Sequence, residues 1–363
     1  MMIGALPAQA ASAPPWHVSF RSYSTAQSDL QVVSADSKSD AWAAGSTGTG
    51  AKVRSLFMHW TRGKWTTAFA GKFPSFSAVT VTATAPNNVW FFGWDQGNPT
   101  ALVYNGSTLT AKTLPYGFEL GDVVVLNSTN AWAVGENTCN SNNLTTCTTT
   151  VLHWNGSTWL SENVTGLVSQ VATNRSHVWF LDLTRINTHN YVKGIISGLP
   201  VMYEVAGNAL QKVSSPSARI TDDQSMAAAP DGQLWIFAFP ESGKPSAVLL
   251  HWTGRKWTQV SLPANLCPPG YEGYCPMTYE APVVFDGKSG VWVGPMAHWT
   301  GSAWTDASIG LYITKVIGGD EAIAPLGIAP IPGTQNIWLV GWASPKPDSN
   351  AHDAIILAYG AIP

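Results

Sequence analysis

Charged side chains are scarce in this chain. Asp, Glu, Lys and Arg together make up 11% of its 363 residues, against about 25% in an ordinary soluble domain. The formal net charge is −3, and Lys and Arg form no local cluster, so the chain has no general electrostatic attraction for nucleic acid or for an anionic membrane. No stretch approaches the roughly 18 consecutive apolar residues that cross a bilayer. We therefore expect neither nucleic acid as a partner nor a membrane span.

Cysteine is also scarce. The four residues form two pairs of identical spacing, Cys139 with Cys147 and Cys267 with Cys275. Neither pair has the C-x-x-C form of a zinc or redox site, and no histidine or second cysteine pair lies close by to complete a tetrahedral shell. We expect two local disulfides and no metal site. Three connectivities are open in principle, and free thiols would instead indicate a reducing compartment.

The motifs of several common enzyme classes are missing. The Gly-x-Gly segment at 48–50 does not open a helix after a strand, so it does not indicate a phosphate-binding loop. The chain has no G-x-S-x-G, H-E-x-x-H or EF-hand pattern. We therefore expect no cofactor.

The first 15 residues are rich in alanine and proline. Ala8, Ala10, Ala11 and Ala13 give two A-x-A candidates for signal-peptide cleavage, although the basic segment and most of the apolar segment of such a signal are missing. We expect residues 1–15 to be the remnant of a secretory signal or a disordered leader. Together with the low charge content, which is common in exported proteins, this predicts a secreted, extracellular protein.

Tryptophan, in contrast, is abundant, with 18 residues. Seven of them recur in one phrase, a Trp inside a short apolar run that usually ends in glycine. Successive copies lie 42 to 57 residues apart, a spacing that indicates propeller blades or solenoid units. The copies occupy residues 40–45, 88–93, 130–135, 177–182, 233–238, 290–294 and 336–341.

The third copy shows a whole repeat, over residues 122–162. Runs at 122–126, 131–134, 150–154 and 158–161 indicate four strands, here named A to D, and Asn155-Gly156 marks the hairpin between C and D. Seven such units predict an all-β fold, a seven-bladed β-propeller of four-stranded antiparallel blades, with residues 16–363 as a single domain. We expect it to be a monomer.

The last repeat has strands A, B and C and no room for strand D before residue 363. Trp16–Arg21, near the start of the chain, is an alternating segment that opens with Trp, as strand D does in other repeats. We predict that this segment supplies the missing strand and closes the ring, because closure removes two exposed sheet edges.

Half of the eight histidines belong to the repeat. They stand before a Trp at the same place in strand C, and equivalent positions in different blades lie far apart around a ring. We therefore expect a structural role, not a shared metal site, for these residues: His59, His153, His251 and His298.

We expect function on one face of the ring. The A–B and C–D turns lie on one face, here called the turn face, and the B–C and D–A connections lie on the other, the loop face. Long insertions fall in the connections, at 136–149, 183–200, 214–224, 262–280, 307–325 and 343–353. Because ligand-binding residues concentrate on loops held by a rigid scaffold, the candidate ligand-binding residues are loop aromatics: Trp94, Tyr116, Tyr271, Tyr274 and Trp342.

Acidic residues suggest one catalytic alternative. Asp182 ends strand B of the fourth repeat, where most copies have glycine. Arg185, His189 and Tyr191 follow in the next connection, and Asp222 stands in the D–A connection after that repeat. Paired carboxylates in one sector would suit glycoside chemistry, as general acid and as nucleophile or base, although solvated loop residues are the simpler interpretation.

The combined pattern, W-x-x-G followed by L-H-W-x-G-x-x-W, resembles the propeller repeats of secreted proteins from bacteria such as actinomycetes, and more distantly kelch and Asp-box repeats. The kelch double glycine is absent, and residues 155–159 lack the Asp-box order. The favoured function is an extracellular binding or scaffold protein that engages a glycan or a protein through the loop face. The alternative is a carbohydrate-active enzyme, a glycosidase or polysaccharide lyase, with its site on the same face.

Overall fold

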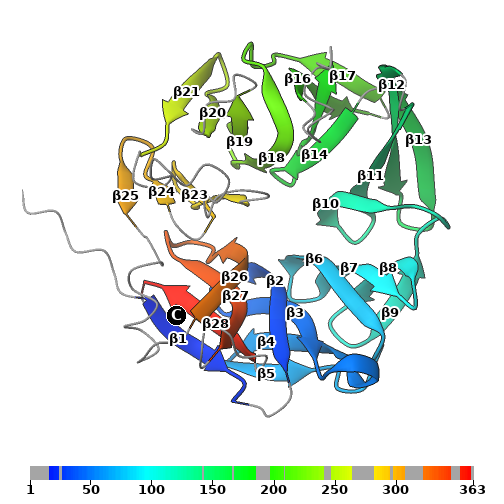
Figure 1. The fold of residues 1–363 in the computed structure, drawn as a ribbon, viewed down its shortest axis with the longest axis vertical. Coiled ribbons are helices and arrows are strands. Elements are labelled where there is room, and N and C mark those ends of the chain that lie inside the picture. The colour runs from blue at the N-terminus through cyan, green and yellow to red at the C-terminus, as the bar shows by residue number, and fades with distance from the viewer. Residues whose placement is uncertain are drawn as a thin grey trace, which may run out of the picture.

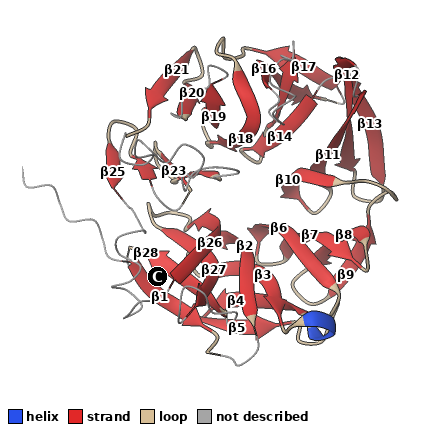
Figure 2. Cartoon of the chain, viewed as in Figure 1, coloured by secondary structure: helices blue, strands red, loops and turns tan. Residues whose placement is uncertain are grey.

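The computed structural model describes residues 16–23, 27–140, 143–165, 167–184, 197–207, 209–240, 247–263, 282–294, 297–306, 322–344 and 352–360. These residues form 28 strands and one short 3-10 helix, Gly50–Lys52, as Figure 2 shows. The all-β class expected from the sequence is confirmed. No helix in this part of the chain is long and apolar enough to cross a membrane.

The strands form antiparallel sheets set around a central opening (Figure 1). Five of the sheets have four strands each. They are β2 (Ser28–Ser37) to β5 (Lys64–Ala68) with β3 (Asp40–Thr47) and β4 (Arg54–Thr61) between them; β6 (Phe76–Ala85), β7 (Asn88–Asp95), β8 (Asn98–Tyr104) and β9 (Leu109–Thr113); β10 (Leu120–Asn127), β11 (Asn130–Asn140), β12 (Asn143–Trp154) and β13 (Trp159–Thr165); β22 (Val283–Phe285), β23 (Val291–Val293), β24 (Ala297–Trp299) and β25 (Trp304–Asp306); and β26 (Ala322–Pro330), β27 (Ile337–Ser344) and β28 (Asp353–Tyr359) with β1 (Trp16–Arg21).

A sixth sheet has eight strands and contains two consecutive meanders. These are β14 (Leu167–Thr173), β15 (Val178–Thr184), β16 (Ser197–Ala206) and β17 (Ala209–Val213), followed by β18 (Ile220–Ala228), β19 (Leu234–Pro240), β20 (Val248–Trp252) and β21 (Trp257–Ser261). Two residue pairs between β16 and β18, Ser197 with Thr221 and Gly198 with Ile220, join the meanders. A propeller of four-stranded antiparallel blades is therefore observed, whereas the count of seven blades stays a prediction.

The glycine that ends the Trp phrase lies where strand A comes very close. A Cβ at Gly93 would lie 1.9 Å from the backbone oxygen of Ser77, and one at Gly341 would lie 2.0 Å from that of Ala324. Strand β6 shifts register immediately after Ala78, the residue that pairs with Gly93. Glycine is needed here because only a residue without a side chain admits so close a neighbouring backbone.

The predicted closure of the ring is confirmed. Strand β1 pairs antiparallel with β28, from Trp16 opposite Tyr359 to Arg21 opposite Ile355. At the far end of this pair the Arg21 Nε atom donates to Asp353 Oδ2 at 2.9 Å, and both side chains are largely buried. The N-terminal segment therefore completes a four-stranded sheet with the last three strands of the chain.

Tryptophan rings fill the wedges between neighbouring sheets. Trp338 of β27 is fully buried, and its ring centroid lies 5.0 Å from that of Trp60 and 5.3 Å from that of Trp65, which belong to the next sheet around the ring. Trp90 of β7 meets Trp154 and Trp159 in the same way, at 6.0 and 6.3 Å. Large aromatic side chains bury the most apolar area per residue, so the repeated Trp residues are the packing elements of the ring.

The hairpin at 130–154 corrects one expectation. Residues 136–149 were expected to form an irregular loop, but β11 continues to Asn140 and β12 begins at Asn143. The added length of both strands is rich in Thr and Asn and shows no apolar alternation. It still forms strand because two adjacent segments of a hairpin can pair through their backbones without an apolar pattern. The connection between β7 and β8 is also a short hairpin, with Asp95 opposite Asn98.

Candidate functional site

The repeated histidines are held by the sheets in which they lie. His59 stacks on Trp42 with ring centroids 3.8 Å apart, and its Nε2 lies 2.9 Å from Asp40 Oδ2. The Trp42 Nε1 atom donates to the other carboxylate oxygen at 3.0 Å. His153 stacks on Trp132 at 4.0 Å, so the arrangement recurs in separate sheets, as expected for a structural role.

His251 repeats the arrangement with an amide as its partner. It stacks on Trp235 at 3.5 Å, and its Nε2 lies 2.6 Å from Gln233 Oε1. Burial lowers the pKa of His251 to about 4, against a smaller opposing effect of the Asp231 charge. His251 is therefore neutral at pH 7, and its Nε2–H donates to the amide oxygen.

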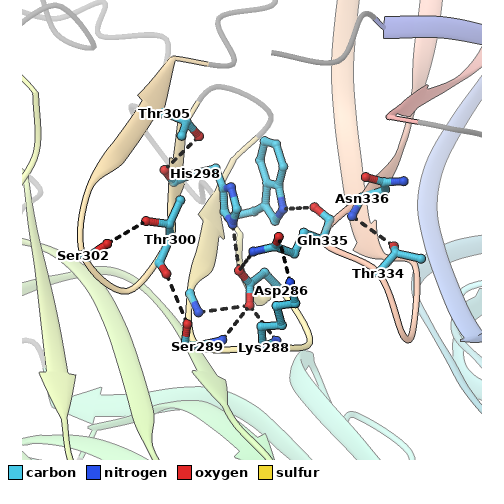
Figure 3. Close-up of polar contacts among 12 residues, drawn as sticks. Asp286, Lys288, Ser289, His298, Thr300, Ser302, Thr305, Thr334, Gln335 and Asn336 are labelled. Atoms are coloured by element: carbon cyan, nitrogen blue, oxygen red, sulfur yellow. Dashed lines mark hydrogen bonds and ion pairs between the residues drawn. The ribbon is translucent and has the colours of Figure 1, made fainter. Parts of the chain in front are cut away.

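The pair of His298 and Asp286 is the most enclosed of these contacts (Figure 3). Their atoms Nε2 and Oδ2 lie 2.8 Å apart, and both residues are buried. Burial by itself would raise the pKa of Asp286. Hydrogen bonds from His298 and from the backbone N–H groups of Lys288 and Gly290 outweigh it and lower the pKa to about 2. Asp286 is thus ionised, and its hydrogen bonds hold the turn in which it lies.

Residues of strands β2, β10, β14, β18, β22 and β26, with the adjoining turns, line a central cavity of about 730 Å³. Asp122 lies on its wall, where Oδ2 accepts from the Val171 N–H of the next sheet at 2.9 Å and Oδ1 from the Val123 N–H at 2.8 Å. Burial within the ring raises the pKa of Asp122 to about 6, although these two hydrogen bonds oppose the change. The Ser34 and Ser225 hydroxyls accept from neighbouring strands in the same way, so these side chains join the sheets.

At the turn-face end of the cavity two charges of opposite sign influence each other. Burial and the neighbouring Asp40 raise the pKa of Asp36, whereas hydrogen bonds with Ser37 and with its own backbone and, least of all, the Arg175 guanidinium oppose the change. Arg175 is exposed and has a positive φ of 74°. Both residues line the cavity.

The loop-face aromatics predicted as ligand-binding residues have different surroundings. Tyr116 is 95% exposed in the connection from β9 to β10. Trp94 and Trp342 were expected in loops but lie in strands β7 and β27, half-buried, because these strands extend beyond the phrase that marked them. Trp342 stacks on His352 at 4.0 Å. Tyr271 and Tyr274 lie outside the described residues.

Tyr23 is a loop-face aromatic that sequence reasoning missed. It lies in the D–A connection from β1 to β2, is 78% exposed and has a positive φ of 41°. The Arg21 guanidinium carbon lies 4.9 Å from the centre of its ring. A single aromatic in a connection follows no pattern, so only its proximity to the predicted closing strand could have drawn attention to it.

The proposed catalytic sector is only partly within the described residues. Asp182 is fully buried in β15, between Val168 and Val201 of the adjacent strands. Burial, together with the Asp182 charge, raises the pKa of Tyr203. Asp222 was expected in a connection but belongs to strand β18, which begins at Ile220. Arg185, His189 and Tyr191 lie outside the described residues.

The cysteines are described only in part. Thr138 of β11 pairs with Thr148 of β12, and Cys139 and Cys147 are the next residues along these two strands. Cys267 and Cys275 lie outside the described residues.

No family model matches the sequence, and no curated protein matches it. Several solved structures have a similar fold. The structure described as YCF48 bound to D1 peptide has a TM-score of 0.56 and 14% identity, over 96% of this chain and 100% of that one. A streptogramin B lyase has a TM-score of 0.56 and 10% identity, over 97% and 99%. The β-propeller domain of the Trilobed protease from Pyrococcus furiosus has a TM-score of 0.57 and 8% identity, over 92% and 95%. At these identities the likeness establishes the β-propeller fold alone.

Proposed function

We propose that this chain is an extracellular binding or scaffold β-propeller that engages a glycan or a protein through its loop face. We further propose seven blades, counting the β14–β17 and β18–β21 meanders separately. The repeated Trp and His residues serve packing, so recognition falls to the connections between strands.

The distribution of exposed aromatic rings carries the proposal. Tyr23 and Tyr116 are the most exposed large apolar side chains among the described residues, at 78% and 95%. Both lie in D–A connections, and therefore on the loop face. Tyrosine combines an apolar ring with a hydroxyl and loses little conformational freedom on binding, which suits it to recognition surfaces.

The enzymatic alternative would place a carbohydrate-active site around Asp182. The similar folds include a protein with a bound peptide and a lyase, but so distant a likeness assigns neither activity to this chain. Burial of the Asp182 side chain within β15 favours binding over catalysis, since a catalytic carboxylate must reach its substrate.

A glycan array with matched variants tests the proposal. Tyr23→Ser and Tyr116→Ser should each reduce the retention of at least one bound glycan at least tenfold. Leu160→Ala should not, because Leu160 is 48% exposed but lies on strand β13, away from the connections. Glycan binding that none of the loop-face changes affects would contradict the proposal. Binding to no glycan would favour a protein partner or a purely structural role.

The extracellular location has its own test. The proposed disulfides, Cys139 with Cys147 and Cys267 with Cys275, would each close a loop of about nine residues and stabilise the fold by roughly 2.5 kcal/mol in the chain-entropy model. Intact mass after alkylation without reductant should show no modified cysteine. Four alkylated cysteines would contradict the location.

A further inference from the structure

A cavity of about 470 Å³ lies on the turn face between the β14–β17 and β18–β21 meanders. It is called the Trp179 pocket here. Its walls come from the A–B turns of both meanders, from strands β15, β16 and β19, and from the ends of β17 and β20. The lining residues that matter for recognition are His177, Trp179, Glu204, Val213, Asp231 and Trp252.

The pocket occupies a wedge in which the Trp pair packs as in another wedge but lacks the lysine that covers it there. Trp252 and Trp257 lie 5.6 Å apart, as the corresponding Trp154 and Trp159 do at 5.5 Å. Between β6–β9 and β10–β13, the Lys112 ammonium lies 4.5 Å from the centre of the Trp154 ring. Lys112 stands three residues after Leu109 in strand D of its sheet. The residue three positions after the corresponding leucine of β17, Leu210, is Val213. No lysine therefore covers Trp252 from this position.

The polar pair of the repeat is reversed at the pocket. In the four repeats that carry the strand C histidine, its acid or amide partner stands before the strand B Trp, as Asp40 does for His59. Here His177 stands before Trp179 and Glu204 lies in strand C, and His177 Nδ1 is hydrogen-bonded to Glu204 Oε1. The His177 side chain is 53% exposed, against 22% for His59 and 7% for His298. The reversal therefore brings an imidazole and a carboxylate to the surface of the cavity.

A second carboxylate is held in place on the opposite wall. Asp231 Oδ2 accepts from Gln233 Nε2 at 2.7 Å, and Asp231 Oδ1 accepts from the Gln233 backbone N–H at 3.2 Å. Gln233 is itself oriented by His251, whose ring lies flat on Trp235. Asp231 is thus an exposed carboxylate at the end of a chain of hydrogen bonds that begins at the half-buried His251.

These groups select the chemistry of a ligand. Among the described residues that line the pocket none is Lys or Arg, so these residues offer an anion no Lys or Arg side chain as a counter-charge. The two carboxylates accept strong hydrogen bonds from hydroxyl groups, and the indole rings offer flat apolar surface. A hydrogen bond with His177 Nδ1 already engages Glu204, and Gln233 already donates twice to Asp231. That arrangement favours a neutral polyhydroxylated ring over a cation.

We propose that the Trp179 pocket binds one neutral pyranose residue of a glycan. The apolar face of the sugar ring lies on Trp252, and its hydroxyls donate to Glu204 and Asp231. A pocket of a few hundred Å³ with aromatic walls and a few fixed polar groups is typical of small-ligand sites. This site lies on the turn face and does not depend on the proposed loop-face surface.

Saturation-transfer difference NMR on the full chain provides the test. The probes are the methyl glycosides of glucose, galactose, mannose and N-acetylglucosamine, with N-acetyl-arginine methylamide as the cationic competitor. At least one glycoside should bind saturably, and Glu204→Gln and Asp231→Asn should each weaken its binding at least tenfold without lowering the melting temperature.

The lysine of the other wedge supplies a matched pair of variants. Val213→Lys should abolish glycoside binding by covering Trp252, whereas Lys112→Val should leave it unchanged. Tyr23→Ser and Tyr116→Ser should also leave it unchanged, which separates this site from the loop face. The proposal would be overturned if no glycoside bound saturably, or if Glu204→Gln and Asp231→Asn left glycoside binding unchanged. Preferred binding of the arginine derivative would also overturn it.

Discussion

Trp16 packs edge to face against Tyr359, with ring centroids 5.2 Å apart and an interplanar angle of 67°. Tyr359 also packs against Trp292 of the preceding sheet at 4.8 Å. In four other C–D hairpins both rings of such a pair are Trp residues of the same hairpin. In the last sheet, β1 and β28 each supply one aromatic ring of that pair.

Ring closure gives the first prediction. Trp16 is 6% exposed, so Trp16→Ala should remove about 3–5 kcal/mol from the free energy of unfolding, measured by denaturant titration. Val18→Ala, on the same strand but 38% exposed, should cost far less. Deleting residues 1–24 should lower the melting temperature sharply. Equal stabilities for the two point variants would contradict the packing role of Trp16.

The His298–Asp286 pair predicts a dependence on acid pH. Asp286 has a pKa of about 2 in the folded chain against an ordinary 3.8, so its stabilisation is present above pH 4 and is lost as the pH falls towards 2. The difference corresponds to about 2 kcal/mol. Asp286→Asn should flatten the loss of unfolding free energy over this interval. If the variant lost unfolding free energy with falling pH as steeply as the wild type, these contacts would not lower the pKa of Asp286.

Asp122 should act in the opposite direction. Its pKa is raised to about 6, so the folded chain holds a proton that the unfolded chain releases near pH 4. Stability should therefore fall as the pH rises from about 4 to about 6, by at most about 3 kcal/mol and by less where water in the cavity screens the charge. Asp122→Asn should remove this fall. If the stabilities of the wild type and the variant instead rose in parallel from pH 4 to pH 6, the raised pKa of Asp122 would be excluded.

The close approach at Gly93 predicts a large cost for a small change. An added methyl group would lie 1.9 Å from the Ser77 backbone oxygen, so Gly93→Ala should force the strands apart and destabilise the chain by about 1–3 kcal/mol or more. Gly121→Ala is the control, because its nearest neighbour is 3.0 Å away. Thermal melts compare the two. A smaller effect at position 93 than at position 121 would contradict the assignment.

Much of the fold could be predicted because it repeats. The phrase around Trp42 and Trp90 marks strand B, and Asn155-Gly156 marks a hairpin, since both follow from local sequence preferences. The segment at Trp16 was recognisable because it begins like a strand D. The pairing between β16 and β18 was not, because it depends on how two neighbouring meanders meet in space.

The candidate sites were less predictable, since they depend on departures from the repeat. The exchange of His177 and Glu204 is visible in the sequence, but only the strand register shows that they occupy the positions of an acid and a histidine in other sheets. Asp182 was expected to end its strand, yet β15 continues to Thr184 and the Asp182 side chain is buried. Val213 becomes informative only beside Lys112 and the Trp ring that Lys112 covers.

The most direct test of a binding role measures bound ligand and newly formed reducing ends in the same sample, using the full chain and the glycans that it retains. We expect saturable binding and no reducing ends beyond those of a blank, for the chain and for Asp182→Ala alike. Reducing ends that accumulate with time and disappear in Asp182→Ala would contradict the binding role and establish an enzyme.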